Sequence, residues 1–246
     1  MKKDELVERA RARAMSFIRR DAYFSDCIAK VLAGDVGAVP SLFSALNGAC
    51  GNYNPAFVSE FHDDACAIMT VLLYEAKIAE PAYAAFLGEA WRNGNHQYII
   101  NKAGSRAKMS RMFKHTGRAS DLPAELGDVF TIYRGVQRTP DIARAARGYS
   151  WTFDRDVACW FAVKHGAPFV RDNSYVIAAT IRRSDVVYYS DDRGEKEIVT
   201  QRAPENYKID GDLDDWIACG NRQNALIKAN NMAHMNEIAE LRALAC

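Results

Sequence analysis

The sequence predicts an α+β protein in which most helices come before the strands. Residues 1–127 are rich in helix-forming side chains, residues 128–200 contain several β-branched and aromatic runs, and residues 221–244 are again helical in character. Helices that are segregated from strands, rather than alternating with them, favour α+β over a doubly wound parallel sheet. We therefore expect a helical N-terminal region over 1–127 and a core over 128–246, both within one globule.

The helical region contains three segments with recognisable boundaries. Residues 5–20 are rich in Ala, Arg and Glu, which favour helix. Residues 64–79 are apolar on most sides, which predicts a buried helix that is too short to cross a bilayer. Pro81 is expected in the first turn of the next helix, because that position needs no backbone N–H. This helix is expected to pass Trp91 and to end at Gly94.

The second half reads as short strands with one helix among them. The expected strands are residues 129–133, 151–153, 174–181, 185–189 and 197–200. Asp154 is expected to cap a helix that runs through Ala162, and Gly166 and Pro168 break that helix. Residues 190–194 form a turn. The expected C-terminal helix has a broad apolar face made of Leu226, Ala229, Ala233, Ile238 and Leu241.

The composition excludes several classes of protein. The chain has 246 residues and a net charge of +1, so overall charge indicates neither a nucleic-acid nor an anionic membrane partner. No apolar run reaches membrane-spanning length, and the N-terminus lacks the apolar core of a secretory signal. The six cysteines include no C-x-x-C pair, so we expect reduced thiols in the cytoplasm. Their even number keeps a secreted, disulfide-bonded protein as the alternative.

Three short motifs stand in order within the strand-rich half. They are Tyr133-Arg134-Gly135, then Ser150-Trp151-Thr152, then Glu195-Lys196-Glu197, and all are expected at strand ends. Together they supply an arginine, a pair of hydroxyls and two carboxylates. A guanidinium matches phosphate oxygens with paired donors, and a fixed carboxylate stabilises a developing cation. The set suits the cleavage of a glycosidic bond in an anionic dinucleotide.

This set resembles the mono-ADP-ribosyltransferases with an R-S-E signature, a family that includes bacterial toxins and phage enzymes. The similarity covers residues 128–200. It implies a fold of two small, packed, antiparallel or mixed β-sheets around an NAD cleft. It also implies transfer of ADP-ribose from NAD+ to an arginine of a target protein, with release of nicotinamide and without a metal. Such an enzyme acts in the cytoplasm of its own cell or is delivered into that of a host.

The resemblance also assigns roles to individual side chains. It implies that NAD+ contacts Arg134, Gly135, Ser150, Thr152 and Glu197. Glu197 would stabilise the oxocarbenium-like cation and bind a ribose hydroxyl, and Ser150 would orient Glu197. In this family a Glu-x-Glu motif goes with arginine as the acceptor, so Glu195 would draw a proton from the target guanidinium. If the strand is regular there, Glu195 and Glu197 share one face.

Several neighbours of the motifs carry further expectations. Trp151 should point away from the site, because alternate residues of a strand face opposite sides. Tyr188 or Tyr189 would contact the substrate, with core packing as the alternative for at least one of them. Phe169 and Arg171, in the loop after the Trp-containing helix, would cover the nicotinamide or the phosphates.

Alternatives remain at the level of function. Water as the acceptor would make the protein an NAD glycohydrolase, and a nucleic acid or small molecule could also accept ADP-ribose. A non-catalytic binding module that keeps the fold is a third hypothesis. The basic stretch 102–118 lacks acidic residues, so it suits phosphate, nucleic acid or an acidic protein, or is simply a solvated helical face. His62 and Cys66 are four residues apart and would share one face of a helix, but two ligands do not make a zinc site, and packing is favoured.

Overall fold

The computed structural model describes residues 3–16, 22–48, 65–165, 170 and 172–244. Contacts divide the chain into two compact units, residues 1–120 and 121–246, whereas the sequence suggested a boundary after residue 127. The segment just after residue 120 belongs to the second unit. Leu122 is buried in the core of the sheet, and the carbonyl oxygens of Leu122 and Pro123 accept hydrogen bonds from Arg183.

The N-terminal unit is helical throughout its described residues. Its α-helices are α1 (Lys3–Ser16), α2 (Ala22–Leu32), α3 (Val39–Gly48), α5 (Ala65–Glu75), α6 (Glu80–Ala90), α7 (His96–Ala103) and α8 (Arg106–Lys114). The expected buried helix is α5, in which eight of 11 residues are buried. It ends earlier than expected, because Lys77 adopts a left-handed φ of 51°. Pro81 lies in the first turn of α6, as predicted.

The helix end expected at Gly94 is wrong. Residues Trp91–Asn95 form a π-helical turn that leads directly into α7. A glycine lowers helix stability without forbidding helical dihedrals, and a π-turn accommodates one extra residue inside a continuous helix. Trp91 is buried at the start of this turn and packs edge-on against Phe113, so packing holds the segment helical.

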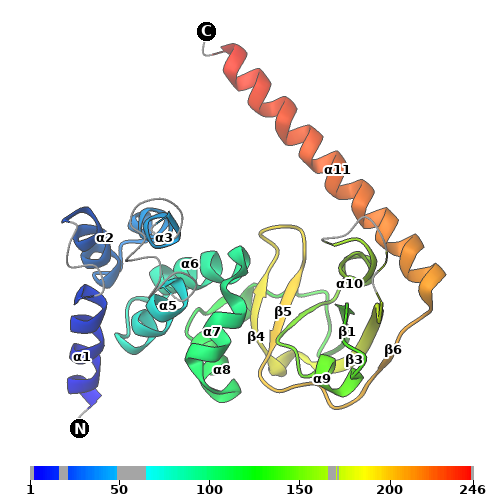
Figure 1. Cartoon of the computed structure of the whole chain (residues 1–246), viewed down its shortest axis with the longest axis horizontal. Helices are drawn as coiled ribbons and strands as arrows, with labels where there is room; N and C mark the ends of the chain where they lie inside the picture. Colours follow the sequence, from blue (N-terminus) through cyan, green and yellow to red (C-terminus); the bar gives the residue numbers. More distant parts are fainter. Residues whose placement is uncertain (1–2, 17–21, 49–64, 166–169, 171, 245–246) are drawn as a thin grey trace. The chain divides into compact units, whose positions relative to one another are not determined.

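The C-terminal unit contains one antiparallel sheet of six strands within its described residues (Figure 1). The strands are β1 (Val129–Val136), β2 (Ser150–Thr152), β3 (Tyr175–Arg182), β4 (Val186–Ser190), β5 (Glu197–Thr200) and β6 (Tyr207–Ile209). Their order is β4-β5-β2-β1-β3-β6. The α+β class is therefore confirmed. The expected pair of packed sheets is instead a continuous sheet of two halves, which the pair Tyr133–Thr152 joins in the described part of the chain.

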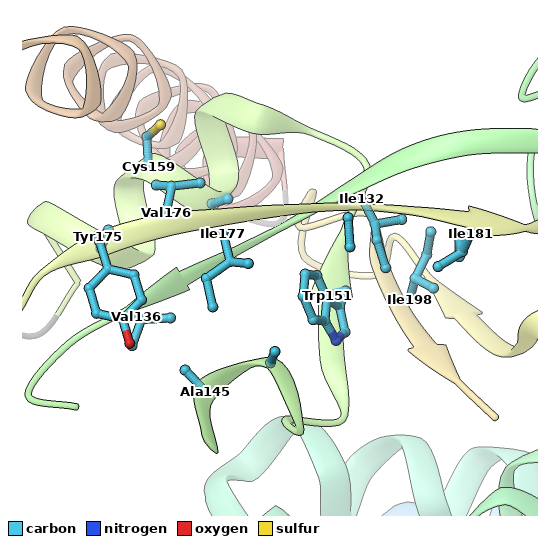
Figure 2. Close-up of a cluster of buried hydrophobic side chains, with 14 of the residues drawn as sticks. Ile132, Val136, Ala145, Trp151, Cys159, Tyr175, Val176, Ile177, Ile181 and Ile198 are labelled. Carbon is cyan, nitrogen blue, oxygen red and sulfur yellow. The ribbon is translucent and has the colours of Figure 1, made fainter. Parts of the chain in front are cut away.

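The core of this unit lies on both faces of the sheet. Figure 2 shows Trp151 and Ile177 on the side that carries Ala145, while Val176 points to the side of Cys159. Ala145 belongs to the short helix α9 (Ile142–Ala146), which the sequence analysis did not anticipate. These five side chains are all buried, so both faces of the sheet contribute to a single apolar core.

Helix α10 (Arg155–Val163) packs directly on β1. A methyl group at Gly135 would lie 2.1 Å from the carbonyl oxygen of Ala158 and 2.7 Å from the backbone nitrogen of Ala162. Only glycine permits this separation, because any side chain would collide with helix backbone. As predicted, Asp154 caps α10, since its carboxylate accepts from the backbone N–H groups of Asp156 and Val157.

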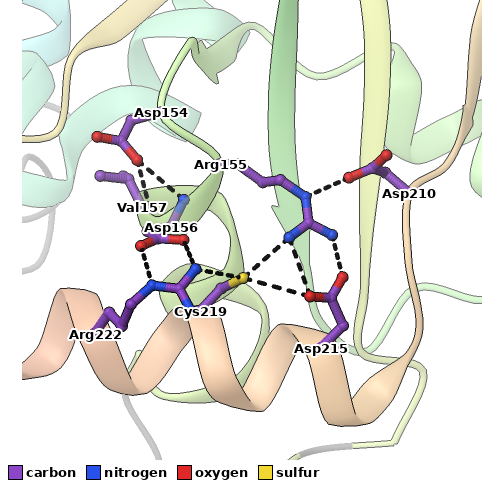
Figure 3. Close-up of polar contacts among 8 residues, drawn as sticks. All are labelled: Asp154, Arg155, Asp156, Val157, Asp210, Asp215, Cys219 and Arg222. Carbon is purple, nitrogen blue, oxygen red and sulfur yellow. Dashed lines mark hydrogen bonds and ion pairs between the residues drawn. The ribbon is translucent and has the colours of Figure 1, made fainter.

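Helix α11 (Leu213–Leu244) begins before the expected residue 221. Figure 3 shows its first turns tied to α10 by two arginines. Arg155 donates to Asp210, Asp215 and the Sγ atom of Cys219, and Arg222 binds both carboxylate oxygens of Asp156. Residues 228–237 of α11 are exposed, and Figure 1 shows this part of the helix extending away from α10.

Four cysteines within the described residues, Cys27, Cys66, Cys159 and Cys219, are free thiols and are buried. The prediction of reduced, packed cysteines is confirmed for these four; Cys50 and Cys246 lie outside the described residues. Burial first, and the neighbouring Cys219 second, raise the pKa of the Cys159 thiol to about 12. None of the helices in the described ranges combines the length and apolar character needed to cross a membrane.

Candidate active site

The three motifs lie on adjacent strands. The serine motif is β2, which lies between β1 with the arginine and β5 with Glu197. In the sequence, Ser150 comes 17 positions after Tyr133, and Glu195 comes 62 positions after Tyr133. Sheet pairing thus brings the motifs together where sequence order alone does not.

One row of side chains crosses the sheet at the centre of this region. Thr152 lies directly opposite Glu197, Glu197 lies opposite Ser190, and Thr152 also pairs with Tyr133. Directly paired residues of neighbouring strands share a face. Ser150 shares that face with Thr152, as predicted, but it lies opposite Val199. Thr152 is therefore the immediate cross-strand neighbour of Glu197, and the orientation of Glu197 by Ser150 stays a prediction.

Arg134 lies within β1 rather than at its end, and it reaches the serine motif through the main chain. Its Nη1 atom donates a hydrogen bond to the carbonyl oxygen of Ser150. Its guanidinium also lies against Gly148, where a methyl group would be 2.3 Å from the Cζ atom of Arg134. Because Arg134 alternates with Tyr133, its side chain starts on the face opposite the row that contains Glu197.

The contact of Arg134 with the Ser150 carbonyl supports β2 from its first residue. The guanidinium is partly buried, and its contact with Gly148 depends on the missing side chain there. The expected contact of Arg134 and Gly135 with NAD+ remains a prediction. What the structure shows for Gly135 is close packing of β1 on α10.

The double-glutamate motif begins in a turn, so the premise of a regular strand is wrong. Strand β5 starts only at Glu197, and Lys196 has a left-handed φ of 48°. The turn is closed by Asp191, whose backbone oxygen accepts from Gly194 N and whose carboxylate accepts from Lys196 N. A left-handed φ at a non-glycine residue is uncommon and costs roughly 1–3 kcal/mol, which surrounding contacts must offset.

Lys196 connects this turn to the first turn of α10. Its Nζ atom lies 2.7 Å from Oδ2 of Asp154, while the other carboxylate oxygen of Asp154 caps the helix. The backbone N–H of Asp154 donates to the hydroxyl of Thr152 at 3.0 Å. The serine and glutamate motifs are therefore both attached to one carboxylate residue at the start of α10.

The two glutamates are electrostatically linked. Burial raises the pKa of Glu195 above its usual value, the guanidinium of Arg193 opposes this shift, and the carboxylate of Glu197 adds to it. The Glu195 side chain is 23% exposed, and Glu197 is buried. A carboxylate with a raised pKa holds a transferred proton better than an ordinary glutamate does, which is the property that a general base requires.

The aromatic residues near the motifs pack in the core. Trp151 is buried on the face opposite Thr152, as predicted, and its Nε1 atom donates to the carbonyl oxygen of Gly148. Tyr188 and Tyr189 are also buried, and Tyr189 stacks on Phe153 with ring centroids 6.0 Å apart. The packing interpretation therefore describes both tyrosines, and a contact with substrate remains a prediction.

Other expected features lie elsewhere or outside the described residues. Phe169, Arg171 and His62 lie outside them. In the basic stretch 102–118, Lys108 forms an ion pair with Glu75 at 2.6 Å, so this lysine serves the N-terminal unit. Among the described residues, no cluster of three or more His, Cys, Asp or Glu side chains has a metal-binding arrangement.

The sequence analysis did not predict the contact of Gly148 with Arg134 or the link between Asp154 and Lys196. Asp154 was recognised only as a helix cap, and Lys196 only as the residue between two glutamates. A signal for Asp154 was present, because a capping carboxylate has a second oxygen that can accept another partner. No sequence pattern announces the left-handed φ of Lys196, since lysine is not a residue type that favours it.

Comparison with protein-family models, curated protein sequences and solved structures finds no significant match for this chain. The resemblance to ADP-ribosyltransferases therefore depends on the three motifs and on the contacts between them.

Proposed function

We propose that this protein is a mono-ADP-ribosyltransferase that moves ADP-ribose from NAD+ to an arginine of a target protein. The observation that carries the proposal is the adjacency of the three motif strands, with the serine motif in the middle. A charge-coupled pair of glutamates at the end of this array supplies the chemistry. The finer fold expected from the resemblance, an ADP-ribosyltransferase fold around an NAD cleft, belongs to the same proposal.

Glu197 is the residue that stabilises positive charge during bond cleavage. The bond between nicotinamide and ribose breaks with its electron pair leaving on nicotinamide, so the ribose becomes cationic. A buried carboxylate stabilises such a cation more than an exposed one does, because water screens it less. Glu197 is buried and is held within β5 between Thr152 and Ser190.

Glu195 is the residue that accepts the proton of the acceptor. A free guanidinium has a very high pKa, so its proton must leave as the nitrogen attacks the ribose. The pKa of Glu195 is raised by burial and by Glu197, which makes its carboxylate a better proton acceptor. Its position before β5, in the turn, leaves its side chain partly exposed to an incoming protein side chain.

Arg134 acts by positioning the serine motif. Its hydrogen bond to the carbonyl oxygen of Ser150 holds the start of β2 beside β1. This contact supplements the strand pairing, which is given by the residue pair Tyr133–Thr152. This role differs from the pyrophosphate contact that the resemblance implies, and a long guanidinium side chain can combine both.

The test is incubation of the protein with NAD+ that carries a label in its adenosine part. A cell lysate or agmatine, a small guanidine, serves as the acceptor in parallel reactions. The expected result is release of nicotinamide and label on protein that hydroxylamine removes, because arginine linkages are sensitive to that reagent. Label on agmatine would confirm that the guanidinium is the reacting group.

Other outcomes separate the alternatives. Free ADP-ribose without labelled acceptor would identify an NAD glycohydrolase. Label on nucleic acid would identify a different acceptor, and the basic stretch 102–118 would then be the first surface to mutate. No release of nicotinamide at any protein concentration would reject the enzymatic proposal in favour of a binding module.

A further inference from the structure

The guanidinium of Arg193 contacts the carboxylate of Glu195, which is the proposed proton acceptor. The Nη2 atom of Arg193 donates to Oε2 of Glu195 at 2.9 Å. The Arg193 side chain is about half exposed, whereas Glu195 is mostly covered, so the arginine approaches Glu195 from the solvent side. Gly194 between them has a left-handed φ of 67° and belongs to the turn that precedes β5.

This pair matches what the proposed reaction needs at its acceptor position. In that reaction a target guanidinium contacts Glu195 and transfers a proton to it. Arg193 supplies the same chemical group to Oε2 of this carboxylate. Its guanidinium partly offsets the raised pKa of Glu195, as an incoming acceptor arginine also would.

We propose that Arg193 is itself an acceptor, so that the protein ADP-ribosylates its own chain at this residue. The inference rests on the proposed function. The bond between nicotinamide and C1′ of the ribose breaks, and its electron pair leaves with nicotinamide. A guanidinium nitrogen of Arg193 forms the new bond to C1′, and its proton passes to Glu195. No oxidant, reductant or metal is needed for the atoms and charges to balance.

The modification changes the site that performs it. Two phosphates would stand beside the turn that holds Glu195 and Glu197, and like charges close together repel. A guanidinium that carries ADP-ribose also presents fewer N–H donors to the carboxylate. Modified protein is therefore expected to transfer ADP-ribose to agmatine more slowly than fresh protein does.

The experiment compares three proteins incubated with NAD+ alone: the wild type, Arg193→Lys and Arg202→Lys. Arg202 is the matched control, because it is an exposed arginine that follows β5 as Arg193 precedes it. Peptide mass spectrometry reads the position of ADP-ribose. Arg193 is expected to carry most of the modification in the wild type and in Arg202→Lys. In Arg193→Lys, total self-modification is expected to fall about tenfold or more.

Protein concentration supplies a second readout. Modification of Arg193 by its own Glu195 is intramolecular, so the fraction modified per minute should not change on dilution. A rate that falls in proportion to dilution would overturn the proposed mechanism, because it would show one molecule modifying another.

Agmatine separates the two proposals. If the wild type modifies agmatine but leaves Arg193 unmodified, this inference is rejected and the proposed function stands. If Arg193→Lys retains wild-type self-modification, the inference is also rejected. If nicotinamide is not released from NAD+ under any condition, the proposed function itself fails, and this inference fails with it.

Discussion

Two charged clusters meet the first turn of α10, and they are built in different ways. On one side, Arg155 uses all three guanidinium nitrogens on Asp210, Asp215 and Cys219, and the pairs fix α10 to α11. On the other side, burial raises the pKa of Glu195 in the turn before β5, the nearby carboxylate of Glu197 adds to this shift, and Lys196 has a left-handed conformation. Both clusters contain acidic and basic residues in similar number.

The two clusters differ in whether their charges mainly hold helices together or mainly belong to the proposed active site. In the Arg155 cluster each charge faces an opposite charge, which favours stability and leaves little for a ligand to gain. In the glutamate cluster, Glu195 and Lys196 also have oppositely charged partners, but the carboxylate of Glu197 still adds to the raised pKa of Glu195 and Lys196 keeps a left-handed φ. Both features cost free energy. Costly features that surrounding contacts maintain are typical of active sites. The contrast predicts that changes in the first cluster act on stability and changes in the second act on activity.

The largest expected effect is the loss of Glu197. The change Glu197→Gln keeps the shape of the side chain but removes the negative charge to which the proposed mechanism assigns stabilisation of the ribose cation. We expect nicotinamide release to fall by about 10²–10³-fold, the range seen when one electrostatic stabiliser is removed. A nicotinamide assay measures this, and Glu205→Gln, at an exposed loop position, is the control. A Glu197→Gln protein that keeps full activity would remove the basis of the proposed mechanism.

Glu195→Gln should separate the two halves of the reaction. Removal of the proposed proton acceptor is expected to lower transfer to agmatine by about 10²-fold, a magnitude typical of general-base catalysis, while hydrolysis of NAD+ falls far less. The ratio of labelled agmatine to free ADP-ribose measures the effect. Equal loss of both activities would contradict the separate roles of Glu195 and Glu197.

A smaller effect on activity is expected when the link between Lys196 and Asp154 is broken. Lys196→Met removes the 2.7 Å contact, and Asp154→Asn removes its charge but keeps a side chain that caps helices well. Both should lower transfer to agmatine by about tenfold, because small displacements of catalytic groups are costly. Lys196→Arg should restore most of the activity. If Lys196→Met changes only the melting temperature, the contact is merely structural.

The opposite behaviour is expected in the Arg155 cluster. Arg155→Met removes charged hydrogen bonds to Asp210 and Asp215, and should lower the free energy of unfolding by about 2 kcal/mol. Urea denaturation measures this loss. Arg222→Met, at a more exposed pair with Asp156, should cost less. Nicotinamide release per folded molecule should change much less than in Glu197→Gln, and a comparable loss would erase the distinction between the clusters.

The smallest effect concerns pH and stability. Because the folded state raises the pKa of Glu195, it holds this proton more tightly than the unfolded chain does. The stability contributed by the protonated form is present at low pH and is lost as pH rises through the folded pKa. Glu195→Gln mimics the protonated form, so its melting temperature should exceed that of the wild type at pH 7. The difference should disappear near pH 4, as scanning calorimetry at both pH values would show.

Local patterns predicted most elements of the C-terminal unit, because β-branched runs and a capping aspartate carry strong local preferences. Strand β3 and the cap of α10 are examples. The helix end at Gly94 failed because burial of Trp91 overrides a weak glycine preference. The turn at Lys196 and the reach of Arg134 to Ser150 depend on contacts between distant residues, and no local pattern encodes them. The three motifs could be found in the sequence, but the contacts that position them could not be predicted from it.

The missing side chain at Gly135 has one more consequence. Because α10 lies directly on the backbone of β1 there, the helix and the strand cannot slide independently without a backbone collision. The same helix starts at Asp154, which holds Lys196. A partner protein or small molecule that tilted α10 would therefore displace the arginine, serine and glutamate motifs together, and would slow the proposed transfer reaction.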